Sequence, residues 1–178
     1  YPILGMLLLL GSAIALTVER ASVEELTTES SIIIHGRILS VESVWEDPEK
    51  IPGNINTFID VQVLEAVKGN SEDIISVRQM GGKIGEFEDI IVGTPGFQEG
   101  EEALLFLVWH EGYWEIHSIA LGAYRIFMDE SGTKRAYNDF TAVNVIDPET
   151  GKQVLYDPAE NNYEFNDLVS EVRSYLSR

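Results

Sequence analysis

Hydrophobic and polar residues alternate along much of the chain between residues 31 and 137, a pattern typical of β-strands. In residues 57–67, Ile59 and Val61 fall on one side of the predicted strand, while Asp60 and Gln62 fall on the other. Further strands are expected at 31–45, 74–80, 89–92, 103–109, 113–120 and 123–129, separated by turns rich in Gly, Pro and Asp. Roughly seven or eight short strands predict a mostly β fold, either an antiparallel barrel or a sandwich.

Three local signals refine this strand pattern. Residues 103–109, ALLFLVW, form an uninterrupted apolar run, which predicts a central strand buried on both faces. Gly36, inside a run of β-branched residues, indicates a bulge or bend. Glu111 and Gly112 predict a hairpin turn into the next strand.

Two helices are expected at the ends of this β region. Ser22 and Glu25 have the spacing of a capping box, which predicts a short helix at 23–29. A C-terminal amphipathic helix, with Asn162 as its cap, should dock one apolar face on the strands. That face consists of Phe165, Leu168, Val169, Val172, Tyr175 and Leu176.

Residues 3–18 contain no charged side chain and allow two interpretations. The length lies between that of a signal-peptide core and that of a membrane span. The sequence Ala13-Ile14-Ala15 offers a signal-peptidase site that would leave Leu16 as the mature start. Alternatively, the apolar segment is retained as a helix that contacts the membrane through residues 1–18 before the protein assembles.

The retained helix is the interpretation we favour from the sequence. A chain that begins with Tyr1 and an apolar stretch, without a basic leader, resembles the mature N-terminus of type IV pilin-like subunits, although Gly5 stands where bacterial pilins usually carry glutamate. We divide the chain into an N-terminal segment, 1–30, and a β domain with its C-terminal helix, 31–178. The residues expected to drive assembly are Leu7, Leu8, Leu9, Leu10 and Ile14.

The charge and the cysteine content of the chain disfavour several classes of function. Asp and Glu total 30 against 12 Lys and Arg, a formal net charge of −18, and Lys134-Arg135 is the one adjacent basic pair in the sequence. Such a chain repels phosphate backbones, so nucleic-acid binding is not expected. The acidic surface allows weak calcium binding. The absence of cysteine removes thiol catalysis, iron–sulfur clusters and Cys-based zinc sites.

No arrangement of residues in the sequence predicts catalysis, a cofactor or a metal. His110 and His117 lie in HEGYWEIH, whose spacing belongs to a hairpin and not to the HExxH helix of a metalloprotease. The acidic residues of 99–102 are expected to be solvated loop charges. The aromatic residues are expected to pack in the core and the hairpin and not to form a ligand platform; they are Trp45, Phe106, Trp109, Tyr113 and Trp114. We therefore expect a protein that is not an enzyme.

Residues 22–128 resemble a family of secreted bacterial and archaeal domains without an assigned activity. The resemblance rests on the short helix followed by a strand with Gly36-Arg37, on the turn Val67-Lys68-Gly69, and on the block from Pro95 to Leu107. It implies a small OB- or netrin-like barrel that follows a cleavable signal peptide and in some members accompanies a metalloprotease domain. It implies no catalytic residues.

Two functional hypotheses follow. The first is a non-enzymatic extracellular or cell-surface subunit that self-associates into a pilus-like homopolymer through its N-terminal apolar helix. The alternative is a soluble secreted module, released by signal-peptide cleavage, that binds a partner or accompanies a protease. For this second hypothesis the loops of residues 81–98 are the expected contact surface.

Overall fold

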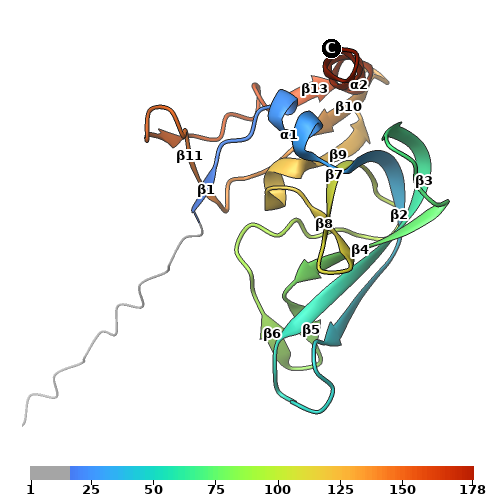
Figure 1. Ribbon diagram of the computed structural model, residues 1–178, viewed down its shortest axis with the longest axis vertical. Helices are drawn as coiled ribbons and strands as arrows, with labels where there is room; N and C mark the ends of the chain where they lie inside the picture. The colour runs from blue at the N-terminus through green and yellow to red at the C-terminus, as the bar shows by residue number, and fades with distance from the viewer. Residues whose placement is uncertain (1–16) are drawn as a thin grey trace, which may run out of the picture.

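The computed structural model describes residues 17–178, and strands dominate it, which confirms the predicted mostly β class. Both helices lie at the same end of the molecule (Figure 1). In chain order the elements are β1 (Thr17–Glu19), α1 (Val23–Glu29), β2 (Ile32–Trp45), β3 (Ile55–Lys68), β4 (Ile74–Met80), β5 (Gly82–Ile84), β6 (Phe87–Asp89), β7 (Glu102–His110), β8 (Tyr113–Ile116), the 3₁₀ turn Ile119–Gly122, β9 (Ala123–Met128), β10 (Lys134–Tyr137), β11 (Asn144–Ile146), β12 (Gln153–Val154), β13 (Asn162–Glu164) and α2 (Phe165–Leu176).

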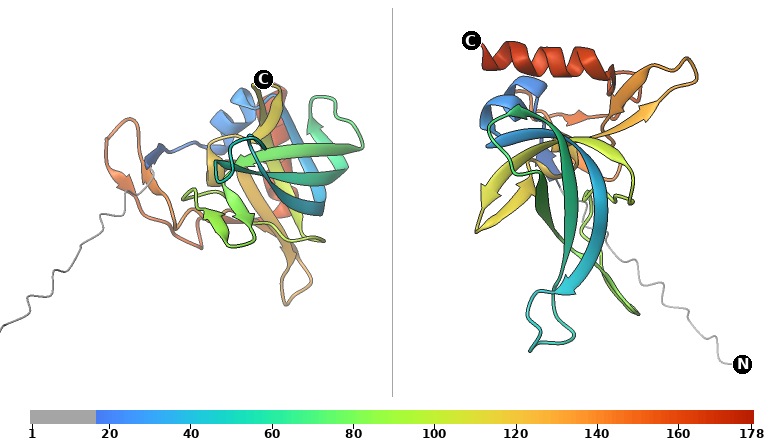
Figure 2. Two further views of the ribbon diagram at one scale, coloured as in Figure 1. Left: turned by 90° about the horizontal axis from the view of Figure 1, so that it is seen from below. Right: turned by 90° about the vertical axis from the view of Figure 1, so that its right-hand side faces the viewer.

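The largest sheet has the strand order β13-β10-β9-β7-β2-β3-β4-β8, and β8 also pairs back with β7. The pairings of β7, β2, β3, β4 and β8 therefore form a circuit. Every pair in this circuit is antiparallel except β4 with β8, which meet in parallel at Val77 and Trp114. The long hairpin of β2 and β3 curves away from the helical end (Figure 2, right).

Gly36 marks an irregularity in β2, as the sequence predicted. The register between β2 and β3 shifts between His35 and Gly36. A Cβ atom at Gly36 would lie 2.9 Å from the carbonyl oxygen of Gln62 and would also collide with Val61. Only glycine lets the two strands approach this closely, because it has no side chain.

The strand β7 separates two apolar cores, which explains its uninterrupted hydrophobic sequence. Leu105 and Leu107 point into a cluster with Val61 and Val77, inside the circuit of strands. Leu104 and Phe106 point the other way, into a second cluster beneath the helices. Residues 103–107 are fully buried, so the prediction of a strand buried on both faces is confirmed.

Helix α1 has the predicted bounds and the predicted capping box. The Ser22 hydroxyl accepts from the Glu25 amide at 3.2 Å, and the Glu25 carboxylate accepts from the Ser22 amide at 2.7 Å. Leu26 is fully buried in the second cluster, together with Leu168 and Val172 of α2. The two helices thus pack against each other and share one core.

Helix α2 docks most of its apolar face as predicted, but Leu176 at its end is exposed and its predicted cap is wrong. The residue at the N-cap is Glu164, which makes no capping side-chain bond. Asn162 lies in β13, where its side-chain oxygen accepts from Nε of Arg135 at 3.1 Å. Because β13 continues its pairing with β10 up to Glu164, the chain is still extended at the position where a cap was expected.

A small three-stranded sheet, β1-β11-β12, adjoins the helical end, and its first strand pairs in parallel with β11. The apolar helix predicted for the N-terminus lies outside the described residues, apart from its last two positions, Thr17 and Val18, which belong to β1 and not to a helix. Between Thr17 and Arg178, no helix combines the length and the apolar character that a bilayer crossing requires.

Candidate functional site

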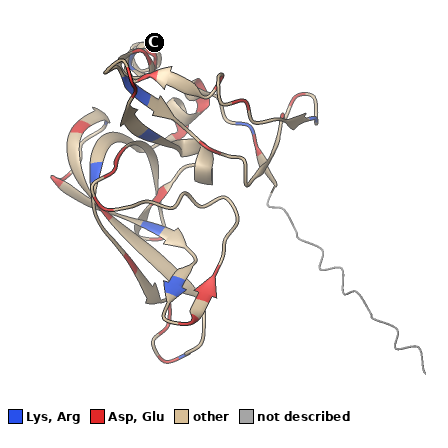
Figure 3. Ribbon diagram, turned by 180° about the vertical axis from the view of Figure 1, so that it is seen from behind, with Lys and Arg blue, Asp and Glu red and all other residues tan. Residues whose placement is uncertain are grey.

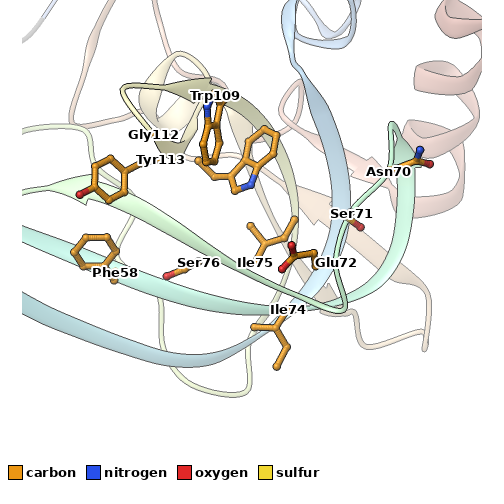
Figure 4. Close-up of a pocket in the computed structure, with 11 residues that line it drawn as sticks. Phe58, Asn70, Ser71, Glu72, Ile74, Ile75, Ser76, Trp109, Gly112 and Tyr113 are labelled. Carbon is orange, nitrogen blue, oxygen red and sulfur yellow. The ribbon is translucent and has the colours of Figure 1, made fainter.

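A groove of about 670 Å³ is lined by residues of β3, the β3–β4 turn, β4 and the β7–β8 hairpin. Trp109 and Tyr113 project from the hairpin towards the strands, and Tyr113 faces Phe58 (Figure 4). We call this the aromatic groove. It is lined by Phe58, Asn70, Ser71, Glu72, Ile74, Ile75, Ser76, Trp109, Gly112, Tyr113 and Trp114.

The alternation of the strands supplies the floor of the aromatic groove. Val61 on β3 and Val77 on β4 are buried inside the circuit of strands. Their neighbours in sequence must point outwards, because successive side chains of a strand alternate between faces. Phe58 and Ile74 point to that outer face, and Ile74 is exposed. Ile75, which belongs to the inner core, points towards Trp109 (Figure 4).

The hairpin between β7 and β8 supplies the opposite wall. Glu111 and Gly112 both have positive φ, at 50° and 88°, as a two-residue type I′ turn requires. This tight turn places Trp109 directly opposite Trp114, and their ring centres are 4.9 Å apart in an edge-to-face arrangement. Trp114 also packs on the inner core, so the hairpin holds Trp109 in place.

Two of the groove aromatics remain open to solvent. Trp109 is 56% exposed and Tyr113 is 41% exposed. The sequence predicted packing for both residues, and Trp109 does pack on Trp114, but its large exposed fraction differs from that prediction. The reason is that β7 extends beyond the core: Val108 is already half-buried, and the strand leaves both clusters before it reaches Trp109.

An ion-pair network fixes the ring of Tyr113. The guanidinium carbon of Arg78 lies 4.2 Å from the ring centre, a cation–π contact. Nε of Arg78 donates to Glu115 at 2.9 Å, and Glu111 lies 3.8 Å away. Nδ1 of His110 lies 3.3 Å from the second oxygen of Glu115. The charge of Arg78 is therefore matched by carboxylates within the protein.

One carboxylate lines the aromatic groove, and two more lie on the adjoining strands. Glu72 is part of the groove lining. In the strand register, Glu42 stands opposite Phe58 and Asp60 stands opposite Ser76, so both carboxylates share the outer face of the sheet. Lys and Arg, by contrast, lie dispersed over separate elements (Figure 3). The groove consequently combines exposed aromatic faces with negative charge.

The histidines of HEGYWEIH do not converge. Nδ1 of His110 faces Glu115, whereas Nε2 of His117 lies 3.1 Å from the carboxylate of Glu29 on α1. The two rings therefore contact carboxylates on different elements. Within residues 17–178, no group of three or more His, Asp or Glu side chains is arranged to hold a metal ion.

The acidic residues of 99–102 are not all solvated, so that prediction is wrong for two of them. Both oxygens of Glu101 accept from Nη1 of Arg125, at 3.0 and 2.9 Å. Glu102 accepts from Lys134 at 2.8 Å, Arg37 at 2.7 Å and His35 at 3.0 Å. The hydrogen bond from Lys134, helped by Arg37 and His35, lowers the pKa of Glu102 to about 2.

The Glu102 cluster consists of Glu102, His35, Arg37 and Lys134. It links β7 with β2 and β10, and it contacts α2 through Phe165. The ring centres of His35 and Phe165 are 4.8 Å apart. The Lys134 ammonium lies 5.0 Å from the centre of the Phe165 ring. His35 is buried, and desolvation lowers its pKa. Each of the two Glu102 oxygens therefore accepts at least one hydrogen bond within the protein.

The residues 81–98, predicted as a contact surface, lie apart from the aromatic groove and contribute nothing to its lining. Part of the segment is ordered as the β5–β6 hairpin, where Phe87 packs edge-to-face on Trp45 at 5.4 Å. Phe97 is buried, whereas Ile90 is exposed. The predicted assembly residues, Leu7, Leu8, Leu9, Leu10 and Ile14, lie outside the described residues.

No protein-family model matches the chain, and a search of curated proteins gives no match either. The resemblances to secreted OB- or netrin-like domains and to pilin-like subunits therefore stay predictions. The geometry of the aromatic groove is the basis for the function proposed below.

Proposed function

We propose that the protein is a non-enzymatic extracellular binding module that holds a segment of a partner polypeptide in the aromatic groove. The observation that carries this proposal is the pair of exposed aromatic side chains, Trp109 and Tyr113, on a rigid hairpin beside an apolar floor. Tyr, Trp and Arg dominate the binding energy of protein interfaces, and they do so best when neighbouring contacts hold them in place.

The strand arrangement supports this assignment. We interpret the circuit of β7, β2, β3, β4 and β8 as a small OB-like barrel, in agreement with the fold that the family resemblance implies. In OB-folds, the face of the second and third strands and the loop between the fourth and fifth strands contribute to the binding of oligonucleotides and oligosaccharides. In this chain those parts are β3, β4 and residues 110–113, which border the aromatic groove.

The extracellular location rests on the sequence of the N-terminal segment. The small-residue motif Ala13-Ile14-Ala15 would release a chain that starts at Leu16. β1 begins at Thr17, so that shorter chain would keep every described element. The competing hypothesis of a filament subunit depends on residues 1–18 and stays a prediction.

The test is a selection of displayed random peptides on the purified protein. We expect binders whose affinity falls about 10-fold or more in Trp109→Ala and in Tyr113→Ala, because truncating a hot-spot anchor at an interface costs about 2 kcal/mol or more and about 1.4 kcal/mol is tenfold. Phe127→Ala is the matched control: Phe127 is similarly exposed but lies on β9, outside the groove. Binders that ignore both groove substitutions, or no binders at all, would contradict the proposal, as would binding confined to neutral oligosaccharides.

A further inference from the structure

We infer that the polypeptide segment recognised by the aromatic groove is cationic, with an Arg or Lys side chain that stacks on Trp109 and pairs with Glu72. This inference rests on the proposed function and adds the chemical class of the ligand. It follows from three features of the described residues: the charge of the groove, the free face of Trp109, and the contact that Arg78 already makes with Tyr113.

Among the described residues that line the groove, the one charged side chain is a carboxylate. This is Glu72, and Glu42 and Asp60 share the outer face of the adjoining strands. Arg78 is the nearby cation, but Glu115 and Glu111 neutralise it. With a net charge of −18 over the whole chain, the surrounding field attracts cations and repels anionic partners.

The Trp109 ring is available for a cation. In the described part of the chain, Arg and Lys side chains stack on Tyr113, Phe97, Phe165 and Tyr175, but none stacks on Trp109. Trp is the aromatic side chain that attracts a cation most strongly. A ring that is more than half exposed, in a groove lined with a carboxylate, therefore has both parts of a guanidinium or ammonium site.

Arg78 provides an internal example of the proposed contact. Its guanidinium stacks on one groove aromatic, Tyr113, while the carboxylate of Glu115 accepts its hydrogen bonds. The proposed ligand repeats this arrangement with Trp109 as the ring and Glu72 as the carboxylate. An apolar segment in the groove would instead bury the Glu72 carboxylate without a cationic partner, and burying an unpaired carboxylate is costly.

The test compares an acetylated and amidated hexa-arginine peptide with the hexa-citrulline peptide, which keeps the planar side chain but removes the charge. We expect hexa-arginine to bind and hexa-citrulline to bind at least about 10-fold more weakly. Trp109→Ala and Glu72→Gln should each raise the dissociation constant for hexa-arginine about 5-fold, which corresponds to about 1 kcal/mol.

The control variants separate a groove site from general attraction to an acidic protein. Glu149→Gln removes one exposed carboxylate on the β11–β12 turn, and Phe127→Ala removes one exposed ring, both outside the groove. If Glu149→Gln weakens hexa-arginine as much as Glu72→Gln does, binding is nonspecific and the inference is wrong.

The peptide selection described above separates failure of this inference from failure of the proposed function. Groove-dependent binders without enrichment of Arg or Lys would overturn the cationic class and leave the binding module standing. A selection without groove-dependent binders would overturn both.

Discussion

The ammonium group of Lys68, at the end of β3, donates to the carbonyl oxygen of Ser30, at the end of α1, across 2.6 Å. The same nitrogen donates to the carbonyl oxygens of Thr27 at 2.7 Å and Thr28 at 3.0 Å. The last turn of α1 contains no basic residue of its own. A cation from a distant strand therefore satisfies the carbonyl groups that a helix leaves unpaired at its C-terminal end.

Replacing this cation should destabilise the fold. In Lys68→Met the aliphatic stem is kept, but the three carbonyl oxygens lose their donor. We expect the free energy of unfolding to fall by about 1–3 kcal/mol in urea denaturation. Lys152→Met, at an exposed position on the β11–β12 turn, should change it by less than about 0.5 kcal/mol. Equal effects of the two substitutions would mean that the Lys68 contacts contribute nothing specific.

The Glu102 cluster should make the stability of the protein depend on pH in the acidic range. The pKa of Glu102 is about 2 in the folded protein, below the ordinary value of 4.5, because Lys134, Arg37 and His35 donate hydrogen bonds to the carboxylate. A depressed carboxyl pKa stabilises the fold above the unfolded pKa, and this contribution is lost as pH falls through the folded pKa. Stability should therefore decline between about pH 4.5 and pH 2.

The substitution Glu102→Gln isolates this contribution. At pH 7 it should lower the free energy of unfolding by about 1.5–3 kcal/mol, because hydrogen bonds to a charged acceptor are lost. The difference from the unsubstituted protein should shrink as the pH falls towards 2. Glu99→Gln, in the exposed loop before β7, is the control and should leave the pH profile unchanged. A constant difference at all pH values would contradict the assigned role.

Gly36 should tolerate no side chain. The added methyl group of Gly36→Ala would meet the Gln62 carbonyl and Val61, so β2 or β3 would have to shift. We expect a loss of about 1–3 kcal/mol in thermal or urea denaturation. Gly96→Ala is the matched control, since a Cβ atom there would have no neighbour within 4 Å. Similar stabilities for the two variants would show that the close approach of β2 and β3 is not rigid.

The hypothesis of a filament subunit has its own test at the N-terminus. Leu9→Asp introduces a charge into the apolar segment, and burial of that charge in a filament core would be costly. Assembly observed by electron microscopy should be abolished, while the β domain keeps its circular dichroism spectrum. Filaments that form unchanged would exclude assembly through this segment. Intact-mass measurement of the native protein would separately distinguish a start at Tyr1 from a start near Leu16.

The parts of the fold that the sequence predicts best are those with a short-range cause. The bounds of α1 follow from the capping box of Ser22 and Glu25, and the double burial of β7 follows from its unbroken apolar run. β1 and β11 carry no such signal. Each has three residues, and they pair across most of the chain, so only the tertiary structure brings them together.

The candidate site was harder to predict for a related reason. Trp109 continues the apolar pattern of β7, and the sequence gives no sign that the core ends just before it. The sequence predicts a solvated loop carboxylate at Glu102, because its three hydrogen-bond donors lie on β2 and β10, far away in sequence. Exposure and ion pairing are properties of the assembled strands, whereas the turn that carries Trp109 and Tyr113 was predictable from Glu111-Gly112.

The packing of α1 against α2 has a consequence for biosynthesis. Leu26 of α1 is buried against Leu168 and Val172 of α2. β1 pairs with β11, which follows it by more than a hundred residues. A growing polypeptide that still lacks α2 cannot complete this core, because such long-range contacts form only after the intervening loop has closed. This core therefore forms only after α2 has been synthesised. For a protein destined for export, this delay would keep the chain extended enough to thread through a translocation channel.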